Sequence, residues 1–325
     1  ADPIRYGWDE ISWPFSLALV SACLAILMTA SARLQLRSNP ATWAANMGVA
    51  ALGILVVMAE TPLAFVLALV PLDTLDFLVV LRLSRTWRFT SRGLMVFVVK
   101  SISTFLIVGA LVYQRTDGFP LEFSTMNATA SLLVLLAIGI RLGLLPLNLT
   151  FAVDIPFQRG LISFLRVAAY AGGMAALARM SSLHGLENWH SLMYGVMVVL
   201  SLYGASMWLR AHNEIEGRQY WLLTTAGLGF LCVLQGNPLQ VLPWGLMLIF
   251  GGTFLFLFSA RGRNLVFLPI LATLMISGLP FSIPARGWSG LFIQPIGFGE
   301  ILVILTSALT LAGFIKHAFS NDENF

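Results

Sequence analysis

Charged residues are scarce in this sequence. They make up 10% of the 325 residues, whereas hydrophobic residues make up 58%. Soluble domains contain roughly 25% charged residues, so a fold whose surface faces water is excluded. In a bilayer the backbone satisfies its own hydrogen bonds in helices or in a closed barrel, and the continuous apolar runs here lack the alternation of barrel strands. The composition therefore predicts an all-α polytopic membrane protein.

Cysteine and histidine are also rare. The two cysteines, Cys23 and Cys232, lie in apolar runs and are expected to be small buried hydrophobic residues. The four histidines lie in loops or near segment ends, whereas a buried haem needs an axial histidine within a span. No metal-ligand spacing, nucleophilic triad or phosphate-binding loop occurs. We therefore expect no catalytic site, no metal and no cofactor bound by this chain, and contact with lipid or quinone stays open.

Long apolar runs dominate the chain instead. About eleven segments reach the roughly 20 residues that a helix needs to cross the hydrocarbon core. No long linker or soluble domain separates them, so residues 1–325 are expected to form a single transmembrane bundle. The predicted spans are 14–32, 43–59, 63–81, 94–113, 128–147, 161–179, 191–209, 219–235, 242–259, 265–282 and 298–316.

The 19 Lys and Arg residues are unevenly distributed. Most of them lie in the loops that follow odd-numbered spans. The positive-inside rule therefore places the N-terminus outside and the C-terminus in the cytoplasm. Because such loop arginines report topology, and because no basic patch alternates with stacking aromatic residues, nucleic acid is not an expected partner.

Three cations lie inside the predicted spans: Lys100, Arg141 and Arg166. An ionised group at bilayer depth is costly, so it usually faces the bundle interior or a wet cavity and marks an ion or substrate path. These three residues are therefore the first candidates for a functional site.

Short motifs surround the two arginines. Arg141 precedes Pro146 by five residues, Asn148 follows in the same segment, and Arg166 precedes Tyr170 by four residues. These spacings resemble those of the antiporter-like, proton-conducting membrane subunits of respiratory complex I and of multisubunit Na⁺/H⁺ antiporters. In that family, lysines stand at the positions of Arg141 and Arg166, and a histidine stands at the position of Asn148.

Weaker matches follow in the same order. The helix that contains Lys100 resembles the family's preceding helix, and the later motifs are Tyr203-Gly204-Ala205 and Ser277-Gly278-Leu279-Pro280. The resemblance covers residues 65–290, which we interpret as an antiporter-like core. It implies one or two broken helices, one at Pro146 and Asn148 and one at Gly278 and Pro280.

The departures from the family bear on mechanism. A buried relay lysine can release its proton, whereas arginine stays protonated in proteins. The positions of the family's later lysines fall near Gly217, near Trp244 or Gly245, and near Trp288 in this chain. The resemblance therefore implies a proton-translocating ancestor whose relay is degraded here.

The family pairs its first lysine with an acidic residue of an earlier helix. Asp73 and Asp76 are the candidates in this chain, and an opposite charge at close range would keep such a carboxylate ionised. We interpret an Asp73–Arg141 pair either as a structural ion pair between two helices or as a proton gate. Lys100 either extends along its apolar stem toward the cytoplasmic surface or takes part in a relay.

The main hypothesis is a non-catalytic membrane subunit of a redox-driven, complex I-like assembly of the NADH- or ferredoxin:quinone oxidoreductase type. Its partners would be other membrane subunits and lipids, in the bacterial inner membrane or an equivalent energy-converting membrane. One alternative is a working proton or cation transporter that uses Asp73, Lys100, Arg141 and Arg166. Another is an unrelated membrane enzyme, for which the sequence offers only His184, Glu187 and His190.

Overall fold

The computed structural model describes residues 4–32, 40–83, 87–145, 159–180, 187–257, 267–292 and 297–319. In these ranges the regular structure is helical, and a single isolated antiparallel bridge joins Tyr6 to Ala59. The elements are α1 (Ser12–Ala32), α2 (Pro40–Met58), α3 (Pro62–Leu83), α4 (Trp87–Thr116), η1 (Phe123–Thr125), α5 (Ala128–Arg141), α6 (Arg159–Arg179), α7 (Glu187–Arg210), α8 (Glu214–Leu234), η4 (Pro238–Gln240), α9 (Val241–Leu257), α10 (Phe267–Ile276), α11 (Ala285–Trp288) and α12 (Phe298–Phe319).

The predicted all-helical fold is confirmed. Within the described residues, four helices are long and apolar enough to cross a membrane: Pro62–Arg82, Gly93–Thr116, Trp189–Arg210 and Phe298–Phe319. Shorter apolar helices accompany them in α1, α2, α5 and α9. The number of spans and their orientation in the membrane remain predictions.

Two helices end earlier than the apolar runs that contain them. The run 128–147 holds α5, which ends at Arg141, and the run 265–282 holds α10, which ends at Ile276. A glycine in the left-handed region follows each end, with φ of 70° at Gly143 and 78° at Gly278. Glycine adopts this conformation without a steric penalty, so each helix can stop while the sequence stays apolar.

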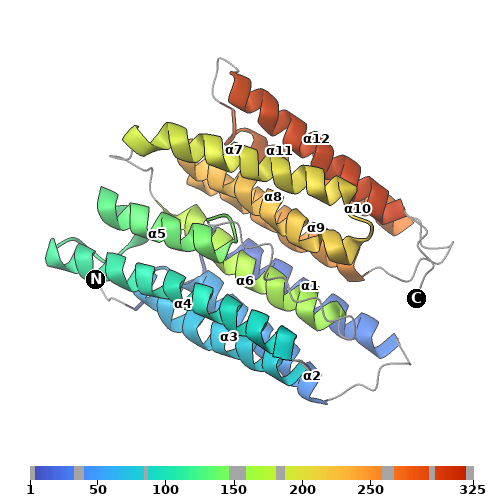
Figure 1. Ribbon diagram of the computed structural model, residues 1–325, viewed down its shortest axis with the longest axis horizontal. Helices are drawn as coiled ribbons and strands as arrows, with labels where there is room; N and C mark the ends of the chain where they lie inside the picture. The colour runs from blue at the N-terminus through green and yellow to red at the C-terminus, as the bar shows by residue number, and fades with distance from the viewer. Residues whose placement is uncertain are drawn as a thin grey trace.

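The helices run side by side in two groups (Figure 1). In the first, α2 packs between α1 and α3, and α4 packs between α3 and α5. In the second, α8 packs between α7 and α9, and α7 contacts α12. Helices α1 and α6 join the groups because both pack against α9. Helix α1 begins at one end of the bundle and α12 ends at the other.

Large apolar side chains lie both inside the bundle and on its surface. The indoles of Trp208, Trp221 and Trp244 are fully buried. On the outer face of α4, however, Phe105 is 74% exposed and Ile102 is 50% exposed. Extended apolar surface of this kind marks contact with a partner or with a membrane, which agrees with the long apolar helices.

A polar cluster fastens the segment before α1 to two other helices. Arg179, the last residue of α6, donates to the Val57 carbonyl at 2.7 Å and to both carboxylate oxygens of Asp9 at 2.9 and 2.8 Å. Asp9 also accepts the Ser12 backbone N–H at 2.6 Å. Burial acts to raise the pKa of Asp9, but the hydrogen bonds from Ser12 and the charge of Arg179 lower it below its ordinary value.

Removing the charge of Asp9 should destabilise the fold at neutral pH but not in strong acid. Because the folded-state pKa is lowered, the stabilisation is complete above the ordinary aspartate pKa and is lost as the pH falls through the lower folded value. We expect Asp9→Asn to lower the free energy of unfolding by about 1 kcal/mol at neutral pH, since Asp9 is partly exposed.

Unfolding of the purified chain in detergent measures this loss, with the exposed Glu10→Gln as the matched control. A loss that stays the same at neutral and strongly acidic pH would contradict the assignment.

Candidate ion site

Five ionisable residues converge from four neighbouring helices, α3, α4, α5 and α6. Asp73 and Asp76 are three residues apart on α3, so they share one face of that helix. Lys100 lies near the middle of α4, Arg141 is the last residue of α5, and Arg166 lies in the first half of α6. All five lie within helices of the bundle rather than in loops.

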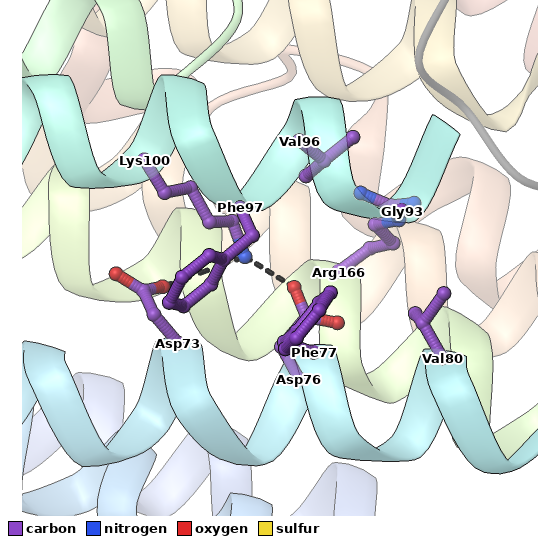
Figure 2. Close-up of a pocket in the computed structure, with 9 residues that line it drawn as sticks. All are labelled: Asp73, Asp76, Phe77, Val80, Gly93, Val96, Phe97, Lys100 and Arg166. Carbon is purple, nitrogen blue, oxygen red and sulfur yellow. Dashed lines mark hydrogen bonds and ion pairs between the residues drawn. The ribbon is translucent and has the colours of Figure 1, made fainter. Parts of the chain in front are cut away.

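Four of these residues form a network of alternating charge. Lys100 Nζ donates to Asp76 Oδ2 and lies 3.5 Å from Asp73 Oδ1. On its other side, Asp73 accepts a hydrogen bond from Arg141 Nη2. The order is Asp76, Lys100, Asp73, Arg141, and we call this set the ion network. Figure 2 shows Lys100 extending from α4 toward both carboxylates of α3.

The ion network is buried. Its four residues are between 4% and 8% exposed. Two carboxylates face two cations, so the network is neutral when every group is ionised. Buried charges are tolerated only when they are paired and hydrogen-bonded, and the alternation supplies such pairs across three helices.

The end of α5 explains how Arg141 reaches Asp73. The Leu144 N–H donates to the Gly139 carbonyl at 2.8 Å, and the Gly143 N–H donates to the Ile140 carbonyl at 3.1 Å. This is a Schellman cap, with Gly143 in the left-handed position that the motif requires. Arg141 therefore lies in the last turn of a buried helix, where the negative end of the helix dipole favours a cation.

Helix α4 is held close to its neighbours on either side of Lys100. Ser103 Oγ donates to the Ala137 carbonyl of α5 at 2.8 Å. Toward α3, the rings of Phe77 and Phe97 stack with centroids 4.7 Å apart. A Cβ added to Gly93 would lie 2.7 Å from Val80 Cγ1, so a side chain larger than hydrogen at Gly93 would push α3 and α4 apart.

A small pocket lies beside the Lys100–Asp76 pair. It is lined by both aspartates, Lys100, Phe77, Phe97 and Arg166, and by Val80, Gly93 and Val96 toward the α3–α4 connection (Figure 2). Its volume is about 10 Å³, which is roughly what one water molecule needs. Arg166 also lines this pocket, but none of the ion pairs among the described residues joins it to Asp73 or Asp76.

Several atoms of the network have unused hydrogen-bonding capacity. Among the described residues, Asp76 Oδ1 and the Nε and Nη1 groups of Arg141 have no hydrogen-bond partner. Nearly all buried polar groups in proteins are hydrogen-bonded to protein or to water. The free oxygen of Asp76, next to a pocket of the right size, is therefore a natural position for a bound water molecule.

The structure brings together Asp73, Asp76, Lys100 and Arg141, with Arg166 across the pocket. Pro146 and Asn148 lie outside the described residues, as does His184 of the enzyme hypothesis. Gly278 and Pro280 lie in the second group, in the turn between α10 and α11. His190 contacts the Leu234 carbonyl at 2.9 Å, and the described residues hold no cluster of three or more metal-ligating side chains.

Sequence reasoning missed two features of the site. It did not pair Lys100 with Asp76, because neither motif nor spacing links α3 to α4. It also did not anticipate the Phe77–Phe97 stack beside this pair. The sequence does indicate where α5 ends. Gly143 follows Arg141 closely, and glycine is the preferred residue just beyond the end of a helix.

Comparison with solved structures finds chains of large membrane complexes. A chain of respiratory complex I from Thermus thermophilus with bound aureothin matches with a TM-score of 0.76 and 18% identity, over 99% of this chain and 79% of that chain. A chain of the Mrp complex from Dietzia sp. DQ12-45-1b matches with a TM-score of 0.73 and 14% identity, over 98% of this chain and 42% of that chain.

A third match is a chain of the membrane-bound sulfane sulfur reductase, an archaeal respiratory membrane complex. Its TM-score is 0.72 at 11% identity, over 96% of this chain and 59% of that chain. No protein-family model and no curated protein sequence matches this chain.

This chain has the fold of these membrane-complex chains. The resemblance to the membrane subunits of complex I and of multisubunit antiporters is thereby confirmed at the level of the fold. At sequence identities of 11–18%, these matches support a shared fold and nothing beyond it. The chain spans less than half of the Mrp chain and about three fifths of the sulfane sulfur reductase chain.

Removing one charge of the Asp73–Arg141 pair should lower the free energy of unfolding more than removing both charges. Arg141→Gln leaves a buried carboxylate with one partner fewer, and Asp73→Asn leaves a buried guanidinium unpaired, so each should lower the free energy of unfolding by about 3–5 kcal/mol. The double variant should lose clearly less than the sum of the single losses, because the two groups interact directly.

The free energy of unfolding is measured in detergent for the wild type, both single variants and the double variant, which together form a double-mutant cycle. Arg115→Gln, an exposed arginine at the end of α4, is the control and should change little. Additive losses in the double variant would show that the two side chains do not interact.

Proposed function

We propose that this chain is a membrane subunit of a complex I-like assembly in an energy-converting membrane. Within it, the Asp73–Arg141 pair serves as a structural tie between helices. The fold similarity to chains of complex I, the Mrp complex and an archaeal respiratory complex supports the assembly. The observation that supports the role is the buried network in which Arg141 bonds Asp73.

The chemistry of arginine favours a structural role for this pair. A proton path needs groups that gain and lose a proton in turn. The guanidinium of Arg141 stays protonated in proteins, and Asp73 lies between Arg141 and Lys100. With a cation on each side, Asp73 remains the acceptor of two ion pairs, and the pair joins α3 to α5 without exchanging protons.

A second candidate function, proton transfer, is favoured by the other end of the network. Lysine, unlike arginine, is a residue type that serves in proton relays. Lys100 contacts Asp76 beside a pocket with room for one water molecule. A proton could then pass between water, Asp76 and Lys100 while Asp73–Arg141 holds the helices. Under this second candidate function, Asp73–Arg141 is the fixed pair of the network and Asp76–Lys100 is the exchangeable pair.

The assembly is tested first by affinity purification of the tagged chain under mild detergent. The proposal predicts recovery of a stable complex with other membrane subunits. Recovery of a solitary chain or of a homo-oligomer alone would overturn it.

Proton movement by the intact complex, reconstituted in vesicles, distinguishes the two ends of the network. We expect Asp73→Asn and Arg141→Ala complexes that remain assembled to move protons as the wild type does, because that pair is structural. Under the second candidate function, Lys100→Gln abolishes proton movement while redox turnover continues, since glutamine cannot carry the proton. Loss of proton movement in an assembled Asp73→Asn complex would contradict the structural role of Asp73.

A further inference from the structure

A second cavity lies in the other helix group, away from the ion network. It has a volume of about 250 Å³ and is bounded by α8, α9 and α12, by the end of α10, and by α11. It exists because α10 stops at Ile276, where Gly278 reverses the chain and the four-residue α11 replaces further helix. We call it the α10–α12 cavity.

The lining of this cavity is mainly apolar. Leu228 of α8, Met247 of α9 and Leu311 of α12 are representative. An apolar cavity is a poor site for water, because each water molecule needs two to four polar partners. A cavity of this size left empty would lose the packing contacts of all its walls. An apolar occupant therefore suits the cavity better than water does.

One residue of the same lining carries a buried polar group. The hydroxyl of Ser307 has no hydrogen-bond partner within the described part of the chain. Ser307 stands out because its neighbours on α12 use their hydroxyls locally: Thr306 bonds the Leu302 carbonyl at 2.8 Å and Thr310 bonds the Thr306 carbonyl at 2.7 Å. A hydroxyl is a hydrogen-bond donor, so an occupant with an acceptor oxygen would complement Ser307.

The cavity adjoins the apolar outer surface of the bundle. Ile304, one of its lining residues, is 44% exposed. On α10, Leu271 and Leu274 are 41% and 52% exposed, and α10 packs against α12. In a membrane these outward apolar faces meet lipid chains, so an acyl chain can enter from the surrounding bilayer.

We propose that the α10–α12 cavity binds one acyl chain of an ester-linked membrane lipid. The apolar walls hold the chain, and the ester carbonyl accepts a hydrogen bond from Ser307. The bound lipid fills the space that the short α10 leaves, and it joins α10 and α11 to α12. This site is independent of the ion network and of the proposed assembly.

Lipid retention tests the proposal. The full chain, or the complex that contains it, is purified with extensive detergent washing, and the phospholipid and quinone that remain bound are quantified by mass spectrometry. We expect the wild type to retain phospholipid. Ala308→Phe, which places a ring in the cavity, should lose it, and Ser307→Ala should retain less because the hydroxyl is gone.

Two matched variants separate the cavity from its surroundings. Leu305→Phe adds a ring on the same helix at a position that is 45% exposed and does not line the cavity. Thr310→Val changes a lining residue whose hydroxyl already bonds within α12. Both should retain phospholipid as the wild type does, and thermal unfolding confirms that each variant is folded.

Three results would overturn the proposal: no phospholipid in the washed wild type, equal retention in wild type and folded Ala308→Phe, or quinone in place of phospholipid.

Discussion

The ion pairs of the Asp73 carboxylate are the interactions that join the helices around the candidate site. The carboxylate receives Arg141 from α5 and lies 3.5 Å from Lys100 Nζ of α4, so one side chain of α3 faces cations from two other helices. Asp76, three residues further along α3, then bonds the same lysine. Inside a bilayer such charges persist only as a set, because each unpaired member would be a buried ion in a medium of low dielectric constant.

The two helix groups use different means to hold their helices together. In α3–α6 the interior is charged, and the contacts are ion pairs supported by the Ser103 hydrogen bond. In α7–α12 the interior is aromatic: Trp208 and Trp221 lie 5.6 Å apart, and Trp244 and Trp288 lie 6.0 Å apart, measured between ring centroids. The ion network thus offers candidate groups for proton chemistry in the first group, and the second group offers an apolar cavity.

The helices were predictable because the bilayer leaves the chain little choice. A run of about 20 apolar residues must satisfy its backbone within itself, and for this reason the sequence indicates where helices lie. It does not indicate as well where they stop. At Arg141 and Ile276 the ends depend on single glycines, Gly143 and Gly278, whose effect is local and invisible to an average over an apolar window.

The members of the candidate site were predictable, but their partners were not. A charged residue in an apolar span is conspicuous by its cost, so Asp73, Asp76, Lys100, Arg141 and Arg166 could be named from the sequence. Which carboxylate meets which cation depends on how α3, α4 and α5 pack. The contact of Lys100 with Asp76 follows from that packing, in which Gly93 and Val80 bring α3 and α4 close together.

The central claim is that Asp73 is held as an ionised partner of Arg141 and Lys100. Infrared difference spectroscopy between the wild-type complex and Asp73→Asn, near neutral pH, tests it most directly. The account predicts that the substitution removes carboxylate bands and leaves the protonated-carboxyl region unchanged. A protonated-carboxyl band that disappears with Asp73 would show that this residue carries a proton, and would contradict the structural role assigned to the pair.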